Sequence, residues 1–304
     1  MSSRPRVFIV GSYGQVGREL QRAFDGRATL VAHDRDTMDI VSPDQVRARV
    51  REAAPDVIIN AAAYTAVDRA ESEPELARAI NAHAPALLAE EALRTDALFI
   101  HYSTDYVFNG AKSGPWVEDD PTGPLSVYGE TKLAGEEAVR AVGGRYLIFR
   151  TSWVFGPHGQ NFVFTMLRLG RERDTLNIVD DQIGAPTSSI ELADATSAIS
   201  LGLLEGRFGN VADSFGVYHM TCSGAVSWCG FARAIFSRAP QLLGGKTPTV
   251  NAISTAQYPT PARRPLNSVL SNEKLAARFG VRLAPWETAL DTVLAAVSAT
   301  QVSA

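Results

Sequence analysis

The chain has 304 residues, of which 45% are hydrophobic and 20% are charged, a balance typical of a globular protein with one large or two small domains. The formal net charge is −4 and Lys and Arg form no run, so composition favours neither a nucleic acid nor an anionic membrane as partner. No apolar stretch has the length of a signal peptide or a transmembrane helix. We therefore predict a cytoplasmic protein.

The first half of the chain alternates short apolar runs with helical patterns. The apolar runs predict buried strands at 6–10, 30–32, 56–60, 97–102 and 146–150. Helical patterns lie between them at 17–24, 43–52, 75–93 and 126–142. Ser42 and Pro43 are a predicted N-cap and first helical residue, and Pro85 predicts a bend. Strands covered by helices on both faces form parallel sheets, so we predict an α/β fold with a Rossmann-type, doubly wound parallel sheet.

The first predicted strand runs directly into a glycine-rich segment, GSYGQVG at 11–17, and a helical pattern follows. Gly11 permits a sharp turn, Gly14 allows the backbone to approach a pyrophosphate, and Gly17 allows the helix to pack closely on the strand. A tight turn without a ligand has the same pattern, but the order of strand, glycines and helix favours a dinucleotide site. Three residues between the glycines are also predicted to contact the cofactor: Tyr13, Gln15 and Val16.

The second predicted strand ends at Asp34 and Arg35, where the adenosine ribose is expected. A carboxylate there suits the ribose hydroxyls of NADH, whereas a guanidinium suits the 2′-phosphate of NADPH. Because the two residues are adjacent, the sequence leaves both cofactors open, and both side chains could also be ordinary loop charges. Further predicted cofactor contacts follow the second, third and fourth strands: Asp39, Ile40, Ala61, Ala62, Ala63, Tyr64 and Ser103.

Three residues have the chemistry of a ketone reductase. Tyr128 and Lys132 are four residues apart in a predicted helix, so their side chains share one face. An isolated tyrosine has a pKa of about 10, and a nearby ammonium lowers that pKa, which makes the phenol a better proton donor. Thr104 follows the fourth strand, where its hydroxyl could bind a carbonyl oxygen. We predict these three residues as catalytic, with Tyr128 and Lys132 also contacting the cofactor.

These features divide the chain into two predicted domains. Residues 1–155 form the NAD(P)-binding domain, in which the alternation of strand and helix is regular. Residues 156–304 contain more Pro and Gly in an irregular pattern and are predicted mainly as a smaller substrate-binding domain. Part of 185–215 is predicted to return to the first domain.

Seven segments resemble the dTDP-4-dehydrorhamnose reductase family of the extended short-chain dehydrogenase/reductase superfamily. They are GSYGQVG at 11–17, NAAAYTAVDRAE at 60–71, STDYVFNG at 103–110, YGETKLAGE at 128–136, RTSWVFG at 150–156, DQIGAPT at 181–187 and TPARRPLNS at 260–268. The resemblance covers nearly the whole chain, and the segments after residue 102 are the more specific to this family.

The resemblance implies that NAD(P)H reduces the C4 ketone of dTDP-4-dehydro-L-rhamnose to give dTDP-L-rhamnose. It further implies a sugar pocket lined by Thr104, Asp105, Tyr106, Val107 and Phe108. Trp153 would pack on the sugar or, alternatively, belong to the core, and Arg264 is a candidate for binding the diphosphate.

The chain departs from the family pattern at two places. Asn109 stands where an Asp is more usual in a tight turn, and we expect little effect because both residues tolerate the turn. Few carboxylates occur at 284–291, where some members hold Mg²⁺ at a dimer interface, so we predict no metal site. A homodimer stays possible. The alternative functions are a reductase or epimerase of another 4-keto nucleotide sugar and a non-catalytic NADP-binding subunit, and the intact catalytic set argues against the second.

Overall fold

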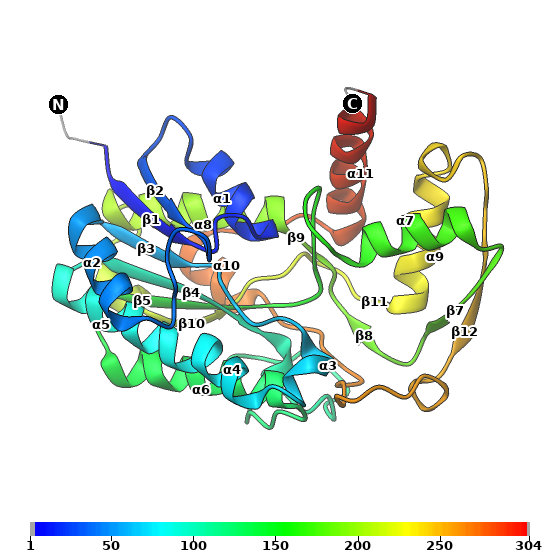
Figure 1. The fold of residues 1–304 in the computed structure, drawn as a ribbon, viewed down its shortest axis with the longest axis horizontal. Coiled ribbons are helices and arrows are strands. Elements are labelled where there is room, and N and C mark those ends of the chain that lie inside the picture. Colours follow the sequence, from blue (N-terminus) through cyan, green and yellow to red (C-terminus); the bar gives the residue numbers. More distant parts are fainter. Residues whose placement is uncertain (1–3, 303–304) are drawn as a thin grey trace.

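The computed structural model describes residues 4–302 and is built on a six-stranded, wholly parallel sheet with helices on both faces (Figure 1). The strand order is β2-β1-β3-β4-β5-β10. The strands are β1 (Arg6–Val10), β2 (Thr29–His33), β3 (Val57–Asn60), β4 (Leu98–Thr104), β5 (Tyr146–Thr151) and β10 (Gly216–His219). The predicted Rossmann-type α/β fold is therefore confirmed.

Alternating side chains of the strands divide the core into two layers. Val7 and Ile9 of β1 face one side, where α1 (Gln15–Phe24) and α8 (Ser189–Leu204) cover the sheet. Phe8 and Val10 face the other side, which is covered by α2 (Pro43–Ala53), α5 (Ala84–Thr95) and α6 (Val127–Val142). Since both faces of the strand are buried, its residues are apolar without alternation, as the sequence indicated.

β4 is longer than predicted, and its length matters for the site. The strand continues to Thr104, so Ser103 and Thr104 are its last two residues at the carboxyl edge of the sheet. Thr104 pairs with Thr151 of β5, which extends the ladder past the end of the apolar run. Because the last two residues of β4 are polar, the hydrophobic pattern placed the end of the strand two residues too early.

The long helix predicted at 75–93 is present and contains one irregular turn. It runs without a gap through α4 (Pro74–Arg78), a π-helical turn (Ala79–His83) and α5, and the π turn lies just before Pro85, where a bend was predicted. The π turn brings the backbone of Asn81 against Gly135 of α6, where a Cβ would lie 2.1 Å from the Asn81 carbonyl oxygen. Pro85 has no N–H to donate to the carbonyl of Asn81, so the regular α-helical hydrogen bond is missing at this turn, and the same carbonyl packs against Gly135 of α6. Ser42 precedes α2 as predicted, but its side chain makes no capping hydrogen bond.

The second half of the chain contains more regular structure than its sequence suggested. It forms α7 (Phe162–Glu172), α9 (Trp228–Arg238), α10 (Glu273–Phe279) and α11 (Trp286–Val302). Three strand pairs link β6 (Val154–Phe155) with β9 (Thr187–Ser188), β7 (Thr175–Val179) with β12 (Thr249–Ile253), and β8 (Ile183–Gly184) with β11 (Val226–Ser227). Helix α8 and strand β10 return to the large sheet (Figure 1). Within residues 4–302, no helix is both long and apolar enough to span a membrane.

Gly135→Ala should reduce the free energy of unfolding, since the added methyl group would collide with the carbonyl of Asn81. Overpacking of this kind costs about 1–3 kcal/mol, more than the helix propensity gained by alanine. Urea denaturation measures the change. Gly114→Ala is the matched control, because no heavy atom lies within 4 Å of its added Cβ. Equal stability of the two variants would contradict the close contact.

Candidate active site

Two adjoining cavities open at the carboxyl edge of the sheet, where the strand order reverses between β1 and β3. Ligands bind at such switch points in open α/β sheets. The cavities measure about 540 and about 440 Å³ and share Gly11, Asp34 and Ala62 among their lining residues. The first brings together thirteen of the predicted residues: Gly11, Tyr13, Gly14, Gln15, Val16, Asp34, Arg35, Ala61, Ala62, Ala63, Ser103, Tyr128 and Lys132. The second adds Asp39, Ile40 and Tyr64.

The glycine loop brings three backbone segments into contact. Gly11 has a φ of +84°, and a Cβ at this position would lie 2.7 Å from the backbone nitrogen of Ala62, which follows the end of β3. Gly17 does not line the cavities, and its Cβ would lie 2.1 Å from the carbonyl oxygen of Gly11. Gly14 is the N-cap of α1, so the free N–H groups of the helix point into the cavity mouth. This arrangement fits a dinucleotide diphosphate, whose oxygens need close backbone donors.

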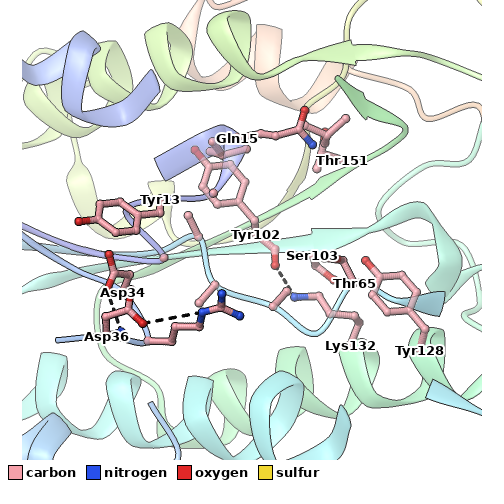
Figure 2. Close-up of a pocket in the computed structure, with 18 residues that line it drawn as sticks. Tyr13, Gln15, Asp34, Asp36, Thr65, Tyr102, Ser103, Tyr128, Lys132 and Thr151 are labelled. Carbon is pink, nitrogen blue, oxygen red and sulfur yellow. Dashed lines mark hydrogen bonds and ion pairs between the residues drawn. The ribbon is translucent and has the colours of Figure 1, made fainter. Parts of the chain in front are cut away.

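The end of β2 offers both signs of charge. The buried Asp34 carboxylate accepts the backbone N–H of Asp36 at 2.9 Å and the Ser12 hydroxyl at 3.4 Å. The Arg35 side chain is 96% exposed and pairs with Asp36 at 4.0 Å (Figure 2). Asp34 is thus held in place while Arg35 is free to move, an arrangement compatible with ribose hydroxyls or with a 2′-phosphate.

Tyr128 and Lys132 project from one face of α6 into the first cavity (Figure 2). Ser126 caps this helix by accepting the N–H of Gly129 at 3.3 Å, so Tyr128 lies in the first turn. The ring of Tyr106 packs edge-on against the Tyr128 ring, with 5.5 Å between centroids. The cap and the ring contact together set the direction of the phenol.

The two side chains have pKa values shifted in opposite directions by burial. Burial lowers the pKa of Lys132 to about 8, and the negative charge of Glu136 partly opposes this shift. Burial raises the pKa of Tyr128 to about 12, and a hydrogen bond with Thr104 partly opposes that shift. The expectation that the lysine lowers the tyrosine pKa is therefore not met in this structure. The Lys132 amino group instead donates to the Tyr102 carbonyl at 2.6 Å (Figure 2).

Thr104 shares a hydrogen bond with Tyr128, and its hydroxyl has two further partners within the protein. It donates to Oδ1 of Asp105 at 3.0 Å and accepts the backbone N–H of Tyr106 at 3.2 Å. Burial raises the pKa of Asp105 to about 6, and the hydrogen bonds that it accepts partly oppose the shift. Thr104 thus links the acid of Asp105 to the phenol of Tyr128.

Four other residues predicted for the sugar pocket make their contacts with other protein side chains. Val107 and Phe108 are fully buried in a small core cluster. Trp153 has a left-handed φ of +47° and stacks on Trp228, with 3.5 Å between ring centroids. Arg264 donates to both carboxylate oxygens of Asp68, at 3.1 and 2.8 Å.

Sequence reasoning missed several lining residues and a buried ion pair. The additional residues of the first cavity are Asp36, Thr65, Tyr102, Thr151 and Val154. Arg150 makes two hydrogen bonds to the Glu136 carboxylate, at 2.9 and 2.7 Å, and Ser103 donates to the same carboxylate at 2.5 Å. The sequence contained two indications of this pair. Arg150 is a charged residue at the end of an apolar strand, and Glu136 lies one helical turn after Lys132 on the same face.

The parallel sheet, the glycine loop and the tyrosine–lysine pair define a Rossmann-type protein of the short-chain dehydrogenase/reductase class. The family model described as RmlD substrate binding domain matches residues 5–299. The dTDP-4-dehydrorhamnose reductase of Burkholderia thailandensis is 47% identical over 289 residues, covering 94% of this chain and 96% of its own. That of Escherichia coli K12 is 45% identical, with 95% and 96% covered. The chain belongs to the dTDP-4-dehydrorhamnose reductase family.

Solved structures agree with this assignment. The dTDP-4-dehydrorhamnose reductase of Clostridium acetobutylicum superposes with a TM-score of 0.88 at 37% identity, covering 96% of this chain and 99% of that one. The Bacillus anthracis reductase, solved in complex with NADP, has a TM-score of 0.86 at 34% identity and the same coverage. A UDP-glucose 4-epimerase of Thermus thermophilus with NAD shares the fold, with a TM-score of 0.78 at 18% identity over 96% and 99%.

Asp105 should make stability depend on pH. Its folded-state pKa of about 6 lies above the ordinary 3.8, so between these values only the folded protein holds the proton. Stability therefore falls as pH rises from about 4 to about 6, by about 3 kcal/mol for this single group. The side chain in Asp105→Asn cannot titrate. Urea denaturation at about pH 4 and at about pH 6 should therefore show that the wild type loses about 3 kcal/mol more unfolding free energy than the variant between these two pH values. A constant difference would contradict the shift.

Proposed function

We propose that this chain reduces the C4 ketone of dTDP-4-dehydro-L-rhamnose to dTDP-L-rhamnose with NADPH or NADH. The observation that carries the proposal is the pair Tyr128 and Lys132, directed from one face of α6 into the cavity that begins at the glycine loop. The names of the relatives, at 47% and 45% identity over most of the chain, support the same substrate. Residues 1–155, with α8 and β10 added, would bind the cofactor, and the remainder would mainly bind the substrate.

The cavity residues suggest how the cofactor would be held. Backbone N–H groups between Gly11 and Gly14 and the N-terminus of α1 would bind its diphosphate. Asp34 and Arg35 lie where the adenosine ribose would be, and the short side chains of 61–63 leave space along the end of β3. When bound, the cofactor supplies a hydride ion to the sugar C4 carbon.

Tyr128 would be the proton donor. With a pKa of about 12, its phenol holds its proton at neutral pH, ready for the ketone oxygen as that oxygen gains negative charge. Lys132, in its ammonium form, would stabilise the phenolate that remains. Thr104 would orient the phenol through their shared hydrogen bond; Thr104 and Lys132 are buried, whereas Tyr128 is half-buried at the cavity wall.

The remaining predicted residues would bind the sugar nucleotide. Thr104, Asp105 and Tyr106 would form the floor of the sugar site, with Trp153 packing beside them, whereas Val107 and Phe108 are fully buried and would support this floor from the core. Arg264 would bind the diphosphate through its planar guanidinium. Because Asp68 already accepts from this guanidinium, phosphate oxygens would have to replace those of Asp68.

The test is an assay with dTDP-4-dehydro-6-deoxyhexoses, each combined with NADPH and with NADH. We expect loss of nicotinamide absorbance in a one-to-one ratio with product, because a reductase consumes its cofactor. An epimerase recycles the cofactor and would leave the absorbance unchanged. No turnover of any 4-keto sugar nucleotide would support a non-catalytic role instead.

Tyr128→Phe should lower turnover about 10²–10⁴-fold, the usual contribution of a positioned proton donor, while NADPH affinity is preserved. Steady-state kinetics and fluorescence titration with NADPH measure the two effects separately. Tyr146→Phe is the control, since Tyr146 begins β5 at the opposite edge of the sheet and should leave turnover unchanged. Normal turnover in Tyr128→Phe would mean that another group supplies the proton.

A further inference from the structure

A buried chain of hydrogen bonds connects the cofactor cavity to Lys132 and is not explained by the mechanism above. Asn60 and His101 are direct partners on the neighbouring strands β3 and β4, and both are fully buried. Oδ1 of Asn60 accepts the backbone N–H of Ala62 at 3.1 Å. Nδ2 of Asn60 lies 3.1 Å from Nδ1 of His101, and Nε2 of His101 lies 3.3 Å from the Lys132 amino nitrogen.

The direction of each bond follows from the first one. Because Ala62 donates to Oδ1, the Nδ2 of Asn60 carries the donor hydrogens and Nδ1 of His101 must accept. Burial keeps the pKa of His101 well below its ordinary value, so the ring is neutral and its single proton is on Nε2. That N–H points at the amino nitrogen of Lys132.

An ammonium on Lys132 has no lone pair with which to accept this proton, whereas a neutral amine has one. The neutral amine can accept from Nε2 of His101 and still donate to the Tyr102 carbonyl. The ammonium instead requires the other His101 tautomer, with Nδ1 protonated. That tautomer needs Asn60 to turn its amide over, which breaks the bond from Ala62 and places the buried amide hydrogens of Asn60 against the Ala62 N–H, so that a donor faces a donor.

We propose that Asn60 and His101 are positioning residues that favour the neutral amine of Lys132 by selecting the Nε2–H tautomer of His101. The inference rests on the proposed function, in which the ammonium form of Lys132 assists Tyr128, and it assigns to Asn60 and His101 an effect that opposes that form in the protein without cofactor. The inference states further that the protonation of Lys132 depends on the amide orientation of Asn60, which the hydrogen bond from the Ala62 N–H holds in place. Since Ala62 lines both cavities, cofactor atoms that accept this N–H would change the balance.

The other charged and titratable groups around Lys132 do not remove this effect. Glu136, on the same helix, favours the ammonium, but its carboxylate is already neutralised by Arg150 of β5. Tyr128, one turn earlier on α6, is uncharged at neutral pH because its pKa is raised to about 12. Burial, which lowers the pKa of Lys132 to about 8, favours the neutral amine independently of the His101 tautomer.

The His101 tautomer can be read directly in the wild-type protein without cofactor. The chain has five histidines, so ¹⁵N-histidine labelling and long-range ¹H–¹⁵N spectra resolve each ring, and His101→Gln identifies its signals. At about pH 9, above the Lys132 pKa of about 8, we expect the Nε2–H tautomer. The Nδ1–H tautomer under these conditions would overturn the proposal, whatever the behaviour of any variant.

Asn60→Asp tests whether the tautomer acts on Lys132. An aspartate accepts from Nδ1 of His101, so it selects the opposite tautomer and leaves Nε2 free to accept from the ammonium. The chain has four lysines, so ¹³Cε-lysine spectra follow the Lys132 titration directly. We expect the Lys132 midpoint to rise by about one pH unit or more. An unchanged midpoint would overturn the proposal.

Asn81→Asp is the matched control for added negative charge. Asn81 is also buried, and its side chain hydrogen-bonds to the backbone of Tyr64 and to Thr131, the neighbour of Lys132 on α6. These bonds do not involve His101. We expect a clearly smaller shift of the Lys132 midpoint than in Asn60→Asp. Equal shifts would show that charge alone acts, which would also overturn the tautomer mechanism.

Both spectra are independent of turnover, so the two proposals fail separately. A protein that reduces the 4-keto sugar but carries the Nδ1–H tautomer retains the proposed function and loses this inference. A protein with the expected tautomer and the expected Asn60→Asp shift, but without turnover, keeps the coupling and loses the proposed function.

Discussion

Close backbone contacts at glycines are the constraint on which the candidate site depends. Gly17 allows α1 to approach the loop after β1, and Gly11 allows that loop to approach β3. Gly129 and Gly135 do the same for α6, where added Cβ atoms would lie 2.4 Å from the Tyr106 carbonyl oxygen and 2.1 Å from that of Asn81. The cavity and the catalytic helix are therefore placed by contacts that any larger side chain would prevent.

Burial governs the chemistry of the side chains that these contacts place. Lys132 and His101 are buried and Tyr128 is half-buried, so the pKa of each group shifts in the direction that favours its uncharged form. The buried charge pair beside these groups, Glu136 with Arg150, is satisfied by two hydrogen bonds between them and by one from Ser103. The direction of the hydrogen bonds, more than the net charge, then decides the protonation state of Lys132 and the tautomer of His101.

Several parts of the fold followed from local chemistry. The strands of the first half and the glycine loop were predicted close to their observed positions, because buried parallel strands and phosphate-binding turns each restrict a few adjacent residues. The π-helical turn at Ala79–His83 lies just before Pro85, where the sequence predicted a bend, whereas the return of β10 to the sheet was not predicted. That return depends on pairing with β5, more than fifty residues away, which a local pattern does not contain.

The sequence alone determined the Rossmann-type sheet, the spacing of Tyr128 and Lys132, and the family, since these depend on residue types at short range. Tertiary structure decided the rest. It showed that the Lys132 amino group lies on the Tyr102 carbonyl and on His101, and that the guanidinium of Arg264 is bonded to Asp68. Such pairings join side chains from different strands, helices and loops, and only the folded chain specifies which donors meet which acceptors.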